Sequence, residues 1–291
     1  MTDVVSRDSR RALAPEWRQW LVENLLRGTA PEDLVAELMG AGVPEARARE
    51  AVAVEQAEPH LQGALRAVQR QRKLEGLLDV YADLHRQGAS PAQVARHASL
   101  SPEAFFARYY FQNLPVVLGP EAWAGGPSAS AWAVEQVAEL LGSDAVCLPL
   151  FEAARLASLR DTLTLPRGYV ADPARASEPK LWWTPGGAEA PLRVSRHNLL
   201  LGQVQGRIEI SLVPAFEWMR VQGADPEGRA PFRLEVALAP GELLLIPVGW
   251  WYALHAPEAC VGISFEGFAT PARNVRWADL DGEPELTPFP G

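Results

Sequence analysis

The chain has 291 residues, of which 48% are hydrophobic and 22% charged, and its formal net charge is −9. This length and composition are those of ordinary globular proteins with material for one large and one smaller domain, and they exclude a disordered or fibrous chain. The acidic balance argues against a general nucleic-acid binder, because contact with phosphates requires a clustered basic surface.

The sequence also lacks the signals of membrane and secreted proteins. No apolar run reaches the roughly 18 residues of a membrane span, and the stretch from Met1 to Asp8 has neither the basic nor the apolar segment of a signal peptide. We therefore expect a cytoplasmic protein with no membrane contact. Cys147 and Cys260 lie far apart in sequence, and in a reducing compartment they are expected to be buried apolar residues and not a disulfide. No cysteine or histidine spacing suggests zinc.

Apolar residues recur at helical spacing in roughly the first hundred residues. A first helix is predicted to bury one face, formed by Trp17, Trp20, Leu21 and Leu25. Thr29 precedes Glu32 by three residues with a proline between them, a capping pattern that predicts a second helix ending near residues 40–42.

A long helix is predicted next, ended by Gly88. Its apolar positions are Leu61, Leu65, Val68, Leu74, Leu77, Leu78, Tyr81 and Leu84. Capping patterns at residues 90–93 and 101–103 then predict two short helices, the second carrying aromatic residues up to Tyr110. The pair has the look of a helix-turn-helix, but no basic recognition face accompanies it, so DNA binding is not expected.

From Pro115 onward, short apolar or alternating runs are separated by glycine and proline. These runs are residues 116–118, 181–183, 199–201, 208–212, 232–238 and 243–246. Many short strands with closely spaced turn signals predict an all-β barrel or sandwich. We therefore predict an α+β protein with a helical module at residues 1–98, a strand-rich core at 99–278 and a tail at 279–291.

Three segments, in the right order, resemble the JmjC-like cupin family, the bacterial cupin-like group related to asparaginyl hydroxylases. They run from Phe105 to Leu118, from Ala190 to Arg207 and from Leu238 to Tyr252. The third contains Pro-Gly and then Ile-Pro-Val-Gly-Trp-Trp, which is the most specific part, and the ending from Ser264 to Asn274 also fits. The resemblance implies a double-stranded β-helix, the cupin or jelly-roll fold, over about residues 100–276.

The resemblance also implies where an iron and 2-oxoglutarate site belongs. Family members read Thr-Pro-Leu-His-x-Asp in the second segment and Gly-Trp-Trp-His in the third, which supplies a facial triad for iron. At the position two residues after Gly206, family members carry a lysine that pairs with 2-oxoglutarate. In this chain the three ligand positions are Arg193, Ser195 and Tyr252, the lysine position is Ile208, and the leading threonine is Ala190.

These side chains suit neither cofactor. A guanidinium has no free lone pair and keeps its positive charge, so Arg193 would repel a dication. We therefore predict no cofactor and no conventional dioxygenase activity. Two alternatives remain open: a relocated metal site built from His197, His255 and Glu209 or Glu266, and a metal-free catalyst that uses Tyr252 or His255 as its acid–base group.

Three interpretations of the altered pocket differ in what Arg193 contacts. Arg193 could form an internal ion pair with Glu209 or Glu242, turn out to solvent, or bind an anion together with Ser195 and Tyr252. The other residues expected around this pocket are Ile208, Trp183, Asn198 and Gln203. Within the pairs Trp182–Trp183 and Trp250–Trp251, one member must face away if the strand is regular.

The sequence thus favours a non-catalytic or repurposed JmjC-like cupin protein that binds a peptide, a protein or a small anionic molecule, with a homodimer among the expected assemblies. The alternatives are a hydroxylase of a peptide or small metabolite with relocated ligands, a metal-free enzyme in the same pocket, and an interaction protein that acts through its helical module.

Overall fold

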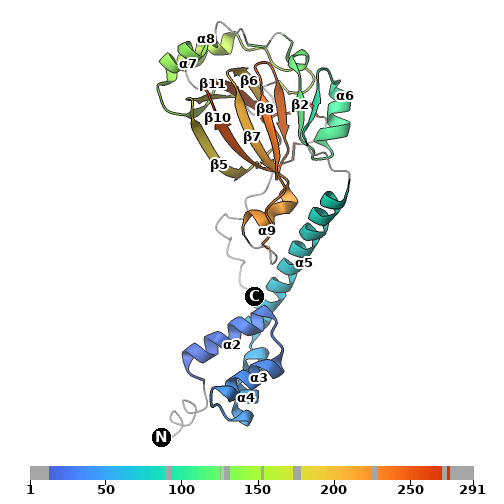
Figure 1. Ribbon diagram of the computed structural model, residues 1–291, viewed down its shortest axis with the longest axis vertical. Helices are drawn as coiled ribbons and strands as arrows, with labels where there is room; N and C mark the ends of the chain where they lie inside the picture. The colour runs from blue at the N-terminus through green and yellow to red at the C-terminus, as the bar shows by residue number, and fades with distance from the viewer. Residues whose placement is uncertain are drawn as a thin grey trace, which may run out of the picture. The chain divides into compact units, whose positions relative to one another are not determined.

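The computed structural model describes residues 13–88, 93–124, 126–127, 132–151, 154–172, 178–223, 228–270 and 274–275. Contacts divide the chain into two compact units, Met1–Tyr81 and Ala82–Gly291. The described part of the first unit is helical, and all the described strands belong to the second (Figure 1). The predicted α+β order of N-terminal helices followed by a strand-rich region is therefore confirmed.

The division falls within a helix, whereas the sequence predicts a boundary after residue 98. Residues 95–97 form a strand that pairs with residues 116–118 of the second unit, so the segment after the helix belongs with the strands. The predicted tail at 279–291 lies outside the described residues.

The first unit has a small core of its own. Its helices are α2 (Pro15–Arg27), α3 (Pro31–Gly40), α4 (Glu45–Ala57) and the long α5 (Pro59–Gln87), whose last turn and a half lies in the second unit. The buried side chains that join these helices are Leu21, Leu25, Leu34, Val35, Leu38, Ala48, Val52 and Leu61.

Three details of the helical prediction are corrected. Trp17 is 36% exposed and does not share the buried face of Leu21 and Leu25. Thr29 does not cap α3, which begins with Ala30 as its N-cap and no side-chain hydrogen bond there. The strand at residues 95–97 replaces the helix predicted after residue 90, although the predicted cap at residues 90–92 lies outside the described residues. By contrast, the backbone N–H of Ala104 does donate to the hydroxyl of Ser101, 3.3 Å away.

The second unit is built mainly from strands. They are β1 (Ala95–His97), β2 (Val116–Leu118), β3 (Val146–Pro149), β4 (Lys180–Thr184), β5 (Ala188–Val194), β6 (Leu199–Gln205), β7 (Ile208–Val213), β8 (Leu234–Leu238), β9 (Leu243–Ile246), β10 (Trp251–Ala256) and β11 (Cys260–Phe265). Its helices are α6 (Pro102–Phe105), the π-helix η1 (Phe106–Tyr110), the 3-10 helices η2 (Pro120–Trp123), η3 (Ala154–Leu156) and η4 (Ala215–Glu217), α7 (Val134–Leu141), α8 (Ala157–Asp161) and α9 (Trp218–Val221).

The described strands form a large and a small sheet. The large sheet has the order β1-β2-β9-β6-β11-β4-β3, and the small one has the order β5-β10-β7-β8. Apart from the parallel β1–β2 pair, neighbouring strands are antiparallel. One apolar cluster contains residues of both sheets, such as Leu201 and Leu244 from the large sheet and Ile210 and Leu212 from the small one. The two sheets therefore pack face to face.

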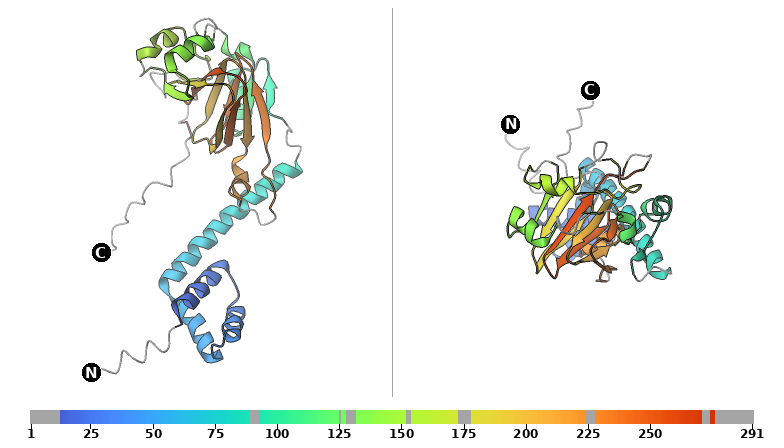
Figure 2. Two further views of the ribbon diagram at one scale, coloured as in Figure 1. Left: turned by 60° about the vertical axis from the view of Figure 1, so that its left-hand side comes forward. Right: turned by 90° about the horizontal axis from the view of Figure 1, so that it is seen from above.

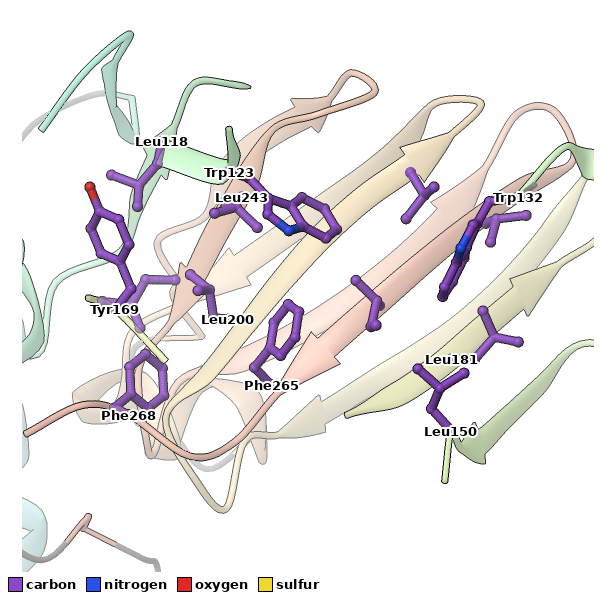
Figure 3. Close-up of a cluster of buried hydrophobic side chains, with 14 of the residues drawn as sticks. Leu118, Trp123, Trp132, Leu150, Tyr169, Leu181, Leu200, Leu243, Phe265 and Phe268 are labelled. Carbon is purple, nitrogen blue, oxygen red and sulfur yellow. The ribbon is translucent and has the colours of Figure 1, made fainter. Parts of the chain in front are cut away.

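The other face of the large sheet carries a second core. Leu181, Leu200 and Phe265 point to this side, where Trp123 and Trp132 lie over them (Figure 3). Helix α7, which also belongs to the second unit, contacts β4 and β11 (Figure 2). Because the large sheet is covered on both faces, its inner strand β9 is apolar throughout, and all four of its residues are buried.

The turn between β6 and β7 depends on Gly206. Its φ is +70°, and a Cβ there would lie 2.5 Å from the carbonyl oxygen of Ala259. The side-chain amide of Gln203 donates to the backbone carbonyls of Gln205 and Gly206, at 2.7 and 3.2 Å, so it fixes the same turn. Both the backbone conformation and the close approach of the chain therefore require glycine.

We predict that Gly206→Ala lowers the free energy of unfolding by about 2–3 kcal/mol, since it adds a clash with backbone atoms to the left-handed strain of about 1–2 kcal/mol. Gly187→Ala is the matched control, because Gly187 has a φ of +79° but open space around its Cβ. Urea unfolding of both variants should show the larger loss for Gly206→Ala. Equal losses would mean that the contact with Ala259 is unimportant.

Candidate functional site

The candidate site lies where β5 and β10 pair. Tyr252 of β10 is the cross-strand partner of Arg193, and Leu254 is the partner of Ala190. Between these two pairs the chain advances two residues along β10 and three along β5. Strand β5 therefore contains a β-bulge with one extra residue. Tyr252 and Leu254 share the buried face between the sheets, so the bulge turns Ala190 and Arg193 toward that same side.

Arg193 is held against two aromatic rings. Its Cζ lies 5.2 Å from the centre of the Trp182 ring and 4.9 Å from the centre of the Tyr252 ring. Both distances are within the range of a cation–π interaction, which guanidinium groups form readily. Arg193 is exposed to solvent, whereas Tyr252 is only 7% exposed. The guanidinium therefore covers two rings and stays accessible from outside.

Further charged groups lie around this pair. Lys180, two residues before Trp182 on β4, donates from Nζ to the Glu266 carboxylate at 2.6 Å. The exposed thiol of Cys147 is within electrostatic reach of Lys180, Arg193 and Glu266. We call Lys180, Trp182, Arg193, Tyr252 and Glu266 the Arg193 cluster.

This environment shifts the pKa of the Tyr252 hydroxyl. Burial raises its pKa above the ordinary value of a tyrosine, while the charge of Arg193 and a hydrogen bond with it act in the opposite direction. Burial is the larger influence, so the phenol stays protonated at neutral pH. Tyr252 can then donate a hydrogen bond, but it is a poor base.

Ser195 has a different role from its neighbour Arg193. Strand β5 ends at Val194. The Ser195 backbone N–H donates to the carbonyl of Trp250 at 2.7 Å, and its carbonyl accepts from Gly249 at 2.8 Å. Its buried hydroxyl donates to the carbonyl of His197 at 2.7 Å. The polar atoms of Ser195 therefore bond to the local backbone and stabilise the turn before β10.

Asn198 supports the same turn, because its Oδ1 accepts from the backbone N–H of Val248 at 2.9 Å. Gln203 serves the β6–β7 turn, as described above. Ile208 is buried between the sheets, four residues before Leu212, the β7 partner of Tyr252. These three residues shape the surroundings of the site. The polar atoms of Asn198 and Gln203 bond to backbone and to the side chains of Tyr110 and Cys260, which lie outside the Arg193 cluster.

The expected ring from Trp183 is replaced by that of Trp182. Trp183 lies in the core on the other side of the large sheet and donates from Nε1 to the carbonyl of Gly142 at 2.9 Å. Trp182 faces the small sheet and donates to the Ser264 hydroxyl at 2.7 Å. The two tryptophans are adjacent on a regular strand, so they point to opposite faces.

The ion pairs expected for Arg193 are absent from the described interactions. The Glu209 carboxylate accepts from Arg207 at 3.0 Å, and that of Glu242 accepts from Arg96. Stacking on the rings takes the place of an internal ion pair, and Arg193 retains solvent contact, so its charge is not isolated in the core.

Among the residues expected for a relocated metal site, His255 and Glu209 are cross-strand partners on β10 and β7, but within the described residues no third ligand of that set joins them. His255 lies on the face of β10 opposite Tyr252, with its Nδ1 3.6 Å from a Glu189 oxygen. Glu266 is bound by Lys180 at the other sheet. In the part of the chain that the structure describes, no three His, Cys, Asp or Glu side chains are grouped to hold a metal ion.

The side chains at the positions that the resemblance assigns to iron are unsuited to that ion. Arg193 offers no lone pair, the Ser195 hydroxyl is engaged with the backbone, and Tyr252 has a raised pKa that opposes formation of a phenolate. This set of groups does not fit ferrous iron, and the apolar side chain of Ile208 does not fit the far carboxylate of 2-oxoglutarate.

Sequence comparisons give a partial likeness. No protein-family model matches the chain. Over 137 residues it is 26% identical to the lysine-specific demethylase JMJ30 of Arabidopsis thaliana, a match that covers 40% of this chain and 32% of the plant protein. The chain thus spans about a third of the length of that curated relative. Together with the sheet-rich second unit, this similarity supports a JmjC-like, cupin-type fold. Within the residues described, no helix is long and apolar enough to cross a membrane.

We predict that Arg193→Met raises the pKa of Tyr252 further, because it removes the positive charge and the hydrogen bond that oppose the effect of burial. Titration of the phenolate absorbance measures this, and the Tyr252→Phe variant identifies which part of the curve belongs to Tyr252. A Tyr252 titration that is unchanged in Arg193→Met would show that the two side chains do not interact.

Proposed function

We propose that the second unit is a double-stranded β-helix of the JmjC-like type that binds a small carboxylate at the Arg193 cluster and does not act as an iron- and 2-oxoglutarate-dependent oxygenase. The observation that carries this proposal is the solvent-exposed guanidinium of Arg193, held over the Trp182 and Tyr252 rings. The partial likeness to a demethylase and the two packed sheets support the family assignment.

The geometry of Arg193 suits a planar anion. A guanidinium presents N–H donors in a fixed fork that matches the two oxygens of a carboxylate. The rings of Trp182 and Tyr252 limit the rotation of the guanidinium, so less side-chain freedom is lost when a ligand binds. Because Arg193 is exposed, a ligand can reach it without displacing a buried ion pair.

The remaining groups of the cluster are consistent with an anionic ligand. Tyr252 keeps its proton at neutral pH and can donate to a second ligand oxygen. Lys180 and Glu266 form an ion pair with each other, so Arg193 supplies the excess positive charge of the cluster. One unpaired positive charge at this point attracts one carboxylate group of a ligand.

The competing enzymatic function in the same pocket has less support. A general base should have a pKa near the working pH, and burial moves that of Tyr252 away from it. His255, the other candidate, lies on the opposite face of β10. A hydrogen-bond donor role for Tyr252 follows directly from its environment, and a role as base does not.

Isothermal titration calorimetry with succinate as the probe tests the proposal. We expect the wild-type protein to bind succinate and the Arg193→Met variant to bind it at least about tenfold more weakly. A hydrogen bond to a charged group contributes roughly 1.5–3 kcal/mol, and the lower end of this range applies because Arg193 is exposed. The matched control is Arg207→Met. Arg207 is also an exposed arginine, it pairs with Glu209, and it lies outside the Arg193 cluster.

Competition identifies the source of the carboxylate. A peptide that ends in a free carboxylate should displace succinate if the natural ligand is a chain terminus, and its amidated form should not. Succinate binding that is absent from wild type, or equally weakened by Arg207→Met, would contradict the proposed site.

A further inference from the structure

The second half of α5 exposes a row of large apolar side chains. Their exposed fractions are 63% for Leu74, 51% for Leu77, 55% for Val80, 54% for Tyr81 and 59% for Leu84. These residues account for five of the large apolar side chains exposed in the described residues, and all lie within eleven residues of one helix. Such a concentration differs from the scattered exposed apolar residues of ordinary protein surfaces.

The row lies on the side of α5 that does not pack within its own unit. Leu61 is buried in the core of the first unit, and Arg72 donates to the carbonyls of Leu26 and Arg27, at 3.2 and 2.8 Å. These contacts fix the inward side of the helix. Tyr81 follows Arg72 by nine residues, which is about 180° around a helix with 3.6 residues per turn. Tyr81 and its neighbours thus face away from the contacts that hold α5.

The spacing of the row is that of a helix–helix seam. Leu74, Leu77, Tyr81 and Leu84 are separated by three, four and three residues, which is the a and d spacing of a coiled coil. Val80 is adjacent to the seam and widens it. The second half of α5 is therefore expected to pack against another helix through its outer side, in addition to the contacts on its inner side.

From this pattern we propose that two copies of the chain associate through α5, with Leu74, Leu77, Val80 and Tyr81 at the centre of the interface. A symmetric dimer requires a surface that is complementary to itself. The seam contains no charged side chain at its a and d positions, so two copies can meet there without like-charge repulsion.

The area of the row also fits a dimer of modest stability. Five large side chains, each more than half exposed, would together bury on the order of 1,000 Å² over the two copies, the lower limit for specific interfaces. We therefore expect a dimer that forms at micromolar concentrations and dissociates on dilution. The assembly does not depend on the proposed anion site, which lies in the second unit.

Sedimentation velocity of the full chain, over about 1–100 µM, tests the dimer. We expect wild type to shift from monomer to dimer over this range and Leu77→Glu to weaken association by roughly 100-fold, because it places a charge in the apolar seam. The matched control is Val54→Glu. Val54 is an apolar residue of α4 that is 52% exposed, close to the exposure of Leu77, and it lies outside the row.

The far-ultraviolet circular dichroism of the variants should equal that of wild type, because both positions are half exposed. Should Leu77→Glu lose helicity, Leu74→Gln serves as the second variant, and it should also weaken the dimer. A wild-type chain that remains a monomer at the highest concentration would overturn the proposal, as would a dimer that persists in Leu77→Glu or is lost in Val54→Glu.

Discussion

The stacking of the Arg193 guanidinium on the rings of Trp182 and Tyr252 is the interaction on which the character of this site depends. It joins the two sheets, since Trp182 belongs to the large sheet and the other two residues to the small one. A fixed positive charge is tolerated there because the rings stabilise it and solvent still reaches it. A cation at this point favours anions and disfavours a bound dication, so the electrostatics of the cluster determine which ligands it can accept.

Scaffold and site follow different constraints in this chain. Gly206 and the turn at Gly249 keep the backbone conformations that the two β-turns require, with φ values of +70° and +83°. Ser195, beside the second turn, uses its hydroxyl to support the backbone. The backbone around the positions that the resemblance assigns to iron ligands is thus held by local hydrogen bonds. Fold and ligand chemistry can therefore be considered separately here.

The sequence predicted the apolar strands well, because runs such as Leu243–Ile246 can only be buried and the glycines and prolines around them mark the turns. It missed β1, since Ala95–His97 is short and polar and becomes a strand only by pairing with β2. It also missed α4, whose alanines and charged residues give little periodicity. The position of Arg193 could be predicted, but its contacts could not. They follow from the bulge in β5 and from the pairing that turns Trp182 toward the small sheet and Trp183 into the core on the other face of the large sheet.

The most direct test of the central claim is the metal content and 2-oxoglutarate turnover of the purified chain after anaerobic loading with ferrous iron. Because Arg193, Ser195 and Tyr252 stand at the positions that the resemblance assigns to the iron ligands, we predict less than about a tenth of an iron per chain and no consumption of 2-oxoglutarate. Guanidinium and hydroxyl groups do not hold the ion. Close to one iron per chain, with 2-oxoglutarate consumed in proportion to it, would contradict the account.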